Sequence, residues 1–196
     1  MPRITIDPAT ADRFDDAQHA LSGGGDGHGC QCQWWTITNA EFNRTTLDER
    51  RGLLRDEMAA ALPPALIAYV DGEAAGWVRV GPRTRQVRLA RTRNFAASEE
   101  DWDDADVWAV TCFVVRKEHR NRGLTAKLLD AAIDHARAGG ARVVEAYPSD
   151  PNAGKRIPVN DLYRGVLSTF EAAGFREVAR PRPGLAIVSL ELRSRV

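Results

Sequence analysis

The most regular pattern of hydrophobic and polar positions lies between Val107 and Gly140. Residues 107–115 form an almost unbroken run of apolar and β-favouring residues, which is typical of a buried strand. Residues 126–138 repeat small and apolar side chains at helical spacing, which predicts an α-helix. Between them, residues 120–125 (Arg-Asn-Arg-Gly-Leu-Thr) combine cationic side chains, one glycine and a helix start. Because backbone N–H groups point outward at the positive end of a helix, we predict that this loop binds an anion such as a pyrophosphate.

Before this unit, the pattern predicts alternating short strands and helices. A strand is expected over 3–7, a helix from Pro8 and Thr10 to about Leu21, and a second helix from Thr45 or Thr46 to about Ala61. Residues 65–70 and 74–80 are β-rich and are joined by the hairpin signal Asp71-Gly72. Strand-like sequence continues over 79–93.

After the strand, loop and helix of residues 107–140, residues 142–147 form another apolar strand. Residues 148–158 form a loop that contains several prolines and glycines. We expect one helix from Asp161 to Gly174, because Leu162, Val166, Phe170 and Ala173 share a helical face. Two last strands are expected over 175–178 and 185–192. This order predicts a mixed α+β sheet whose clear parallel crossover contains the anion-binding loop.

Composition sets broad limits on function. The chain has 196 residues, 43% apolar and 28% charged, so we expect one domain spanning residues 1–196. Positive and negative side chains balance at 27 each, so nothing global favours nucleic acid or an anionic membrane. No signal-peptide pattern or membrane-length apolar run is present, which favours a cytoplasmic location. The three cysteines are expected to be free thiols, and the Cys30-x-Cys32 spacing near His28 disfavours a structural zinc site.

Several local features have a structural and a functional interpretation. The glycine-rich stretch 22–29 is interpreted as a mobile connector, and Trp34 and Trp35 as packing residues, although glycine beside aromatics also suits an acceptor pocket. The acidic stretch 98–106 is interpreted as a solvated loop, with attraction of a cationic acceptor as the alternative. A solvated face is also preferred over nucleic-acid binding for the arginines of 79–93, namely Arg79, Arg83, Arg85, Arg88, Arg91 and Arg93.

The central unit resembles the GNAT superfamily of N-acetyltransferases. That family's signature places Gln or Arg, two residues, Gly, one residue, then Gly or Ala between a strand and a helix, and Arg120, Gly123 and Thr125 take those places here. Thr125 departs from the usual small residue. The similarity continues at residues 170–175 (Phe-Glu-Ala-Ala-Gly-Phe), which resemble the family's Tyr-Glu-x-x-Gly-Phe. The resemblance implies an α/β/α-layered, mostly antiparallel mixed sheet of about seven strands, splayed between strands 4 and 5.

The resemblance also implies a co-substrate and its binding residues. Acetyl-CoA would bind in the splay, with its pantetheine arm along the backbone of Phe113, Val114 and Val115. Its pyrophosphate would be held by the signature loop, which consists of Arg120, Asn121, Arg122, Gly123, Leu124 and Thr125. Transfer to an amine would be direct and without a metal, so a covalent relay through Cys112 is disfavoured.

The acid and base that relatives use are absent here. The tyrosine that protonates the departing thiolate in many relatives aligns with Phe170, and the glutamate of histone-modifying relatives aligns with Ala109. Tyr163 is therefore our candidate for a displaced acid or a cofactor contact, with simple packing as its alternative. For the base, the candidates are Glu145, Asp106 and a water chain.

These observations favour an acetyl-CoA-dependent N-acetyltransferase that acts on a small-molecule amine. One alternative is an acyl-CoA-binding sensor with little or no turnover, as loss of the usual tyrosine would allow. Another is acetylation of a protein or peptide amine. The expected partner is the amine acceptor, with no nucleic acid and no membrane, and a homodimer is left open as the oligomeric state.

Overall fold

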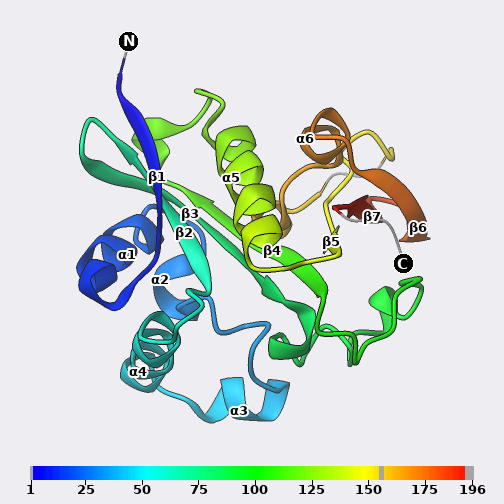
Figure 1. Cartoon of the computed structure of the whole chain (residues 1–196), viewed down its shortest axis with the longest axis horizontal. Coiled ribbons are helices and arrows are strands. Elements are labelled where there is room, and N and C mark those ends of the chain that lie inside the picture. The colour runs from blue at the N-terminus through cyan, green and yellow to red at the C-terminus, as the bar shows by residue number, and fades with distance from the viewer. Residues whose placement is uncertain (1, 155–156, 193–196) are drawn as a thin grey trace.

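A computed structural model describes residues 2–154 and 157–192. Among them, one sheet joins seven strands in the order β1-β2-β3-β4-β5-β7-β6, as Figure 1 shows. The strands are β1 (Ile4–Pro8), β2 (Ala65–Val70), β3 (Glu73–Pro82), β4 (Val107–Val115), β5 (Val143–Ala146), β6 (Arg176–Arg182) and β7 (Leu185–Glu191). All neighbours pair antiparallel except β4 and β5, which are parallel. The mixed, mostly antiparallel sheet predicted from the sequence is confirmed.

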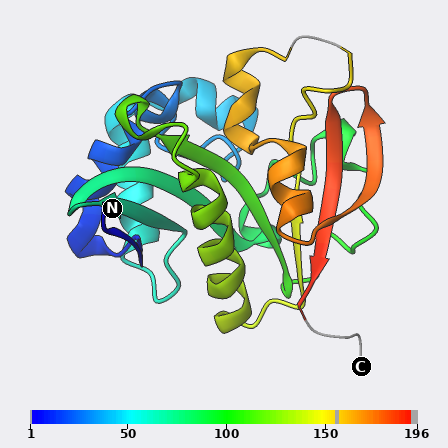
Figure 2. The same cartoon turned by 90° about the horizontal axis from the view of Figure 1, so that it is seen from above.

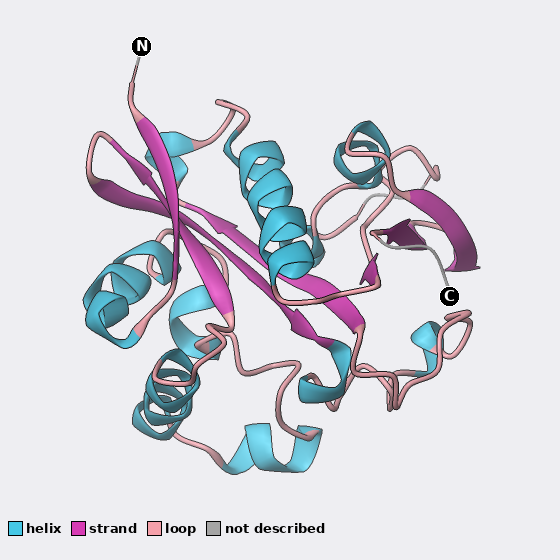
Figure 3. Ribbon diagram, viewed as in Figure 1, coloured by secondary structure: helices cyan, strands magenta, loops and turns pink. Residues whose placement is uncertain are grey.

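Helices cover both faces of this sheet (Figure 3). One core cluster joins α5 (Leu124–Ala138) and α6 (Leu167–Ala172) to one face of the sheet. A second core cluster places α1 (Phe14–Leu21) and α4 (Leu47–Met58) on the other face. Alternate residues of β2 belong to opposite clusters, as the two-residue period of a strand requires. Among the described residues, no helix is both long enough and apolar enough to cross a membrane.

A capping residue marks where α4 begins, as the sequence predicts. Thr46 caps α4 through a capping box with Glu49, so the helix begins immediately after the expected threonine. The sequence did not predict α3 (Asn39–Arg44), although Thr38 and Glu41 form a second capping box there. The other short helix in this region, α2 (Gly27–Cys30), lies in the glycine-rich stretch.

The sheet is splayed between β4 and β5. The two strands pair only over Val107–Val110 and Val143–Ala146, so the second half of β4 has no strand partner on that side. Figure 2 shows the two strands together at one end and separated at the other. The pairing of β3 with β4 also shifts register between Arg79 and Val80, which leaves Thr111 outside the ladder, as in a β-bulge.

The strand-like continuation over 79–93 was wrong beyond Pro82. β3 ends at that residue, and the chain continues through two short 3-10 helices, η2 (Arg83–Arg85) and η3 (Arg93–Phe95), joined by turns. The interpretation of its arginines as a solvated face was also wrong in part, because Arg79, Arg83 and Arg88 are buried. Each of the three guanidinium groups donates to acceptors inside the protein.

The single helix expected from Asp161 to Gly174 was also wrong. The chain forms the 3-10 helix η5 (Val159–Arg164), leaves helical geometry at Gly165, and then begins α6. Gly165 has φ 79° and ψ 173°, which suits glycine and not an L-residue. Ser149 explains the break, since its N–H donates to the Gly165 carbonyl and its carbonyl accepts from the Leu167 N–H.

Candidate functional site

The predicted anion-binding loop links the end of β4 to the start of α5. β4 ends at Val115 as expected, the short 3-10 helix η4 (Lys117–His119) follows, and α5 begins immediately after Gly123. Asn121 and Gly123 have φ of 59° and 71°. These left-handed residues turn the chain sharply, a backbone geometry that is common in loops whose N–H groups bind anions.

Six consecutive backbone N–H groups in this loop are unsatisfied. From Asn121 to Ala126, none donates a hydrogen bond to any described residue, and α5 has no side-chain N-cap. Helix N-termini leave their first N–H groups unpaired, but here the three preceding loop residues are unpaired as well. A Cβ built on Gly123 meets no atom within 4 Å. The loop is therefore an open row of donors whose chemistry fits a diphosphate.

Cationic side chains surround this row of donors. Arg120 and Arg122 are exposed and belong to the loop itself, and no carboxylate of a described residue forms an ion pair with either. The Nε of Arg120 donates to the Val115 carbonyl at 3.0 Å, which holds that guanidinium beside the end of β4. The first turn of α5 contains no acidic residue. The positive potential of the helix start is therefore not cancelled locally.

The glycine-rich stretch packs against this loop, whereas the sequence had suggested a mobile connector. A Cβ on Gly23 would lie 2.4 Å from Cγ of Arg116, and one on Gly24 would lie 2.9 Å from Nη2 of Arg120. Arg116 also donates to the carbonyl of His19 and to Oγ of Ser22. The glycines allow the two segments to approach closely, so residues 23–24 form one wall beside the anion-binding loop.

The unpaired half of β4 contains Phe113, Val114 and Val115. On this strand, alternate residues direct their N–H and C=O groups away from β3, and beyond Val110 no strand of the described chain meets them there. The side chains of Phe113 and Val114 are buried in the two main core clusters. These three residues can therefore offer backbone groups, and not side-chain chemistry, to an extended ligand.

Tyr163 lies on η5, beside this half of β4. Its ring packs against the third core cluster, which includes Trp35 and Tyr147, and it lies within electrostatic range of Cys112. Its hydroxyl has no hydrogen-bond partner among the described residues. Burial raises the pKa of the Tyr163 phenol, so it remains protonated at neutral pH. Phe170, in contrast, is fully buried and contacts Phe113 and Phe175 edge to face.

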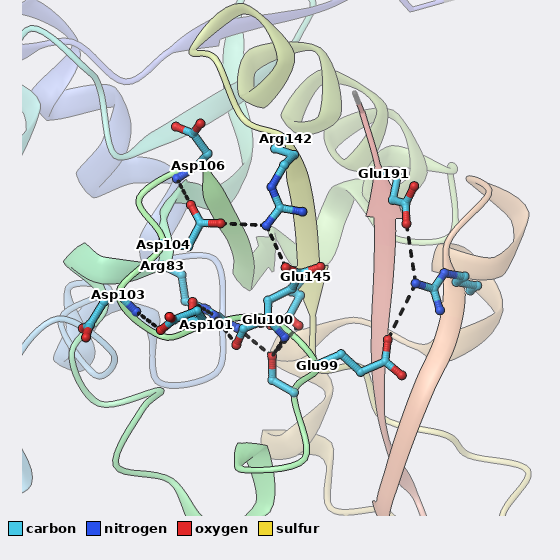
Figure 4. A network of polar contacts seen from close by, with 12 residues as sticks. Arg83, Glu99, Glu100, Asp101, Asp103, Asp104, Asp106, Arg142, Glu145 and Glu191 are labelled. Carbon is cyan, nitrogen blue, oxygen red and sulfur yellow. Dashed lines mark hydrogen bonds and ion pairs between the residues drawn. The ribbon is translucent and has the colours of Figure 1, made fainter. Parts of the chain in front are cut away.

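Glu145 is bound in an internal ion pair (Figure 4). Its side chain is 0% exposed, and Oε2 accepts from Nη1 of Arg83 at 2.6 Å and from the Tyr147 hydroxyl at 3.0 Å. Oε1 accepts from Ser98 at 2.6 Å. Glu145 pairs with Ala109, which lies before the splay begins. These contacts argue against proton transfer by Glu145, whose role as the base was a prediction from sequence.

The acidic stretch 98–106 does not form a simple solvated loop. It wraps around Arg83, which donates to the carbonyls of Glu100 and Asp101 and lies 4.0 Å from the ring centre of Trp102. Glu100 and Asp104 both pair with Arg142, each at 2.7 Å. Asp106, the other carboxylate considered as a base, is exposed at the entrance to β4 and far from Tyr163 along the strand. Figure 4 shows this network beside β5.

All three cysteines are free, as expected. Cys32 is buried, and Nε1 of Trp77 donates to its Sγ at 3.3 Å. The adjacent Cys112 thiol lowers the pKa of Cys32 to about 7, aided by the positive charge of Arg79. His28 and the cysteines do not gather as metal ligands. Among the described residues, one potential three-ligand group was found, namely Glu73, Glu118 and His119.

The family model for the acetyltransferase (GNAT) family matches residues 31–156. The chain belongs to this family. The match spans the segment from Gln31 through β5, so it includes the loop with six unsatisfied N–H groups. The resemblance inferred from Arg120, Gly123 and Thr125 is thereby confirmed for the family and the fold.

Solved structures share this fold at low sequence identity. The yncA protein of Salmonella typhimurium, solved with its cofactor acetyl-CoA, aligns with a TM-score of 0.58 and 18% identity, covering 98% of this chain and 95% of that one. A ribosomal-protein-alanine N-acetyltransferase from Brucella melitensis gives 0.56 and 18%, covering 96% and 99%. An N-acetyltransferase from Staphylococcus aureus Mu50 gives 0.56 and 16%, covering 97% and 99%. No curated protein matches the chain.

The sequence did not predict how the segment between β3 and β4 packs against β4. Gln86 is buried and holds the bulge of β4, because its side chain donates to the Ala109 carbonyl and accepts from the Thr111 hydroxyl at 2.6 Å. Two residues later, Arg88 is buried under Trp34. Nothing in the local sequence distinguishes these two residues from their exposed neighbours, since both lie in a segment whose pattern suggested a strand.

Proposed function

We propose that this GNAT protein transfers the acetyl group of acetyl-CoA directly to the amine of a small-molecule acceptor. The observation that carries the proposal is the row of six unsatisfied N–H groups from Asn121 to Ala126, flanked by Arg120 and Arg122. Such a row suits the pyrophosphate of CoA, and the yncA structure named above contains acetyl-CoA.

Acetyl-CoA supplies the activated acetyl group. The loop Arg120–Thr125 binds its diphosphate, with Gly123 leaving the space for it and the Thr125 hydroxyl available to a phosphate oxygen. The unpaired edge of β4, at Phe113, Val114 and Val115, orients the pantetheine arm as an added strand would lie. Holding both substrates in one complex makes the transfer effectively intramolecular.

Tyr163 is the proton donor in this proposal. Its partly buried phenol carries its proton at neutral pH, because burial raises its pKa, and its hydroxyl has no hydrogen-bond partner among the described residues. It would give that proton to the departing thiolate, the role for which relatives use the tyrosine replaced here by Phe170. Neither Glu145 nor Asp106 faces the splayed half of β4. We therefore propose that water accepts the proton that the amine loses.

We favour a small acceptor over a protein, because glycines beside Trp34 and Trp35 suit a small acceptor pocket. Trp35 shares a core cluster with Ala109 of β4, and Gly23 and Gly24 approach Arg116 and Arg120 beyond the end of that strand. A domain spanning residues 1–196 and a cytoplasmic location remain predictions. The alternative function, a CoA-binding protein without turnover, is favoured by one observation, which is that Phe170 cannot donate a proton.

Turnover separates the two functions. The purified protein should release free thiol from acetyl-CoA in the presence of amines, and mass spectrometry should find the acetylated products. Saturable CoA binding in calorimetry, together with no thiol release across a broad amine panel, would support the binding protein. Absence of both binding and release would contradict the anion-binding loop itself.

A further inference from the structure

Arg88 is a buried cation for which no described residue provides a counter-ion. Four arginines are buried among the described residues, and three of them pair with carboxylates, namely Arg79 with Glu57, Arg83 with Glu145 and Arg164 with Asp161. Arg88 is 7% exposed, yet no carboxylate of the described residues lies within ion-pair distance. A buried charge is costly unless it is paired, so this exception calls for a partner.

The free part of Arg88 is the forked end of its guanidinium. Nε donates to the Ile37 carbonyl at 3.1 Å, which fixes the direction of the group. Nη2 is buried without a hydrogen-bond partner, and Nη1 makes no hydrogen bond with a described residue either. Two parallel N–H groups are thus left available. This geometry matches the two oxygens of a carboxylate, which arginine binds in a bidentate manner.

Aromatic rings hold this end of Arg88 in place. The guanidinium carbon lies 3.9 Å from the ring centre of Trp34 and 5.6 Å from that of Phe42. Trp34 is 37% exposed, so one side of this group reaches solvent. Cation–π contacts keep a guanidinium oriented but do not satisfy its N–H donors.

Arg88 lies on the acceptor side of the splay. Tyr163 packs against the core cluster that contains Trp35 and Ala109 of β4. Its backbone N–H donates to Trp35, which shares a core cluster with Ala109. The anion-binding loop lies beyond Val115, roughly 13 Å further along the strand from the level of Thr111.

We propose that Arg88 binds a carboxylate of the acceptor, so that the substrate class is amines that also carry a carboxylate, such as amino acids. The proposal rests on the acetyltransferase function above and names its acceptor. Trp34 closes over the bound carboxylate from the solvent side. Because the cation is present before binding, the acceptor supplies the counter-ion that the described residues do not provide.

The first test compares each amino acid with its own amide as an acceptor. The wild-type protein should show a kcat/KM about 10- to 100-fold higher for the acid, the range expected for a hydrogen bond to a charged group. Arg88→Gln should remove this preference, and Arg88→Lys should retain part of it because the charge remains. The matched control is Arg91→Gln, an exposed arginine of the same segment, which should keep the wild-type preference.

The second test measures binding without turnover. Titration with N-acetyl amino acids should change tryptophan fluorescence in a saturable way, and the corresponding N-acetyl amides should not. The change should disappear in Arg88→Gln and in Trp34→Phe. Thermal unfolding of each variant shows whether it is folded, and Arg88→Gln should not be less stable by more than a few degrees, since it removes an unpaired buried charge.

The two proposals fail in different ways. Transfer to neutral amines with equal use of acids and amides would overturn the carboxylate site alone. An Arg88-dependent fluorescence change without any acetyl transfer would support the site and overturn the enzyme. Equal losses on acid and amide in Arg88→Gln, in a folded protein, would show that Arg88 serves the architecture and not the acceptor.

Discussion

The buried pair of Arg83 and Glu145 offers the sharpest test of what holds the acidic stretch in place. Both side chains are 0% exposed, and Arg83 also donates to Ser98 and to the Glu100 and Asp101 carbonyls. Arg83→Met keeps the apolar length of the side chain but leaves the carboxylate buried without its cation. We expect a loss of about 3–5 kcal/mol in the free energy of unfolding, because an uncompensated buried charge costs that much. For a chain of this size, the melting temperature should fall by roughly 6–20 °C.

The double variant Arg83→Met/Glu145→Gln separates the charge from the other contacts. Removing the carboxylate's charge should raise the free energy of unfolding by about 2 kcal/mol relative to Arg83→Met. The remaining loss is that of the Arg83 hydrogen bonds to the Glu100 and Asp101 carbonyls. Urea unfolding at neutral pH, followed by circular dichroism, measures both. Arg142→Met is the matched control, since Arg142 is 20% exposed and should cost about 1 kcal/mol. If the double variant is no more stable than Arg83→Met, the pair does not act as a buried ion pair.

Three further predictions concern the site. Gly123→Val should abolish CoA binding in calorimetry while the protein stays folded. The control Gly72→Val, at another left-handed glycine with open space around it, should bind CoA normally. Retained CoA affinity in Gly123→Val would refute the loop assignment. Tyr163→Phe should lower kcat about 100-fold or more with little change in KM for acetyl-CoA, and an unaltered kcat would remove Tyr163 from the mechanism. Cys32 should ionise near pH 7 in the folded protein, by ultraviolet thiolate absorbance against Cys32→Ser. Because its pKa is lowered from 9.0, the stability it contributes is present above pH 9 and is lost as pH falls through 7; no thiolate signal below pH 8.5 would contradict the assignment.

The features predicted correctly from the sequence are those set by local patterns. The apolar run of β4, the helical spacing of α5 and the Arg-Asn-Arg-Gly loop between them all depend on residues within a few positions of one another. The same holds for the hairpin at Asp71-Gly72 and for the cap at Thr46, where one residue type fits one backbone geometry. The mixed sheet then followed from the order of these elements and the one clear parallel crossover.

The failures come from partners that are distant in the sequence. Arg83 and Glu145 are 62 residues apart, so the charge pattern near Arg83 does not show that it is buried. An arginine among polar neighbours normally predicts exposure. The break at Gly165 depends on Ser149, which binds the Gly165 carbonyl and the Leu167 N–H and so prevents a continuous helix. The glycine inside the predicted helix was the one local sign of that break.

The segment from Arg83 to Phe95, which the sequence pattern misassigned, carries Arg88 of the proposed acceptor site. Its first residue is fixed to β5 through Glu145, and Gln86 is fixed to the bulge of β4, so the backbone that carries Arg88 is anchored on both strands of the splay. The diphosphate-binding loop shares none of these contacts. Loss of the Arg83 contact to Glu145 should therefore weaken binding of the amine more than binding of acetyl-CoA. In folded Arg83→Met, KM for the amine acceptor should rise while the affinity for CoA stays near that of the wild type; equal losses for both would show that the anchor serves the whole sheet and not the acceptor side.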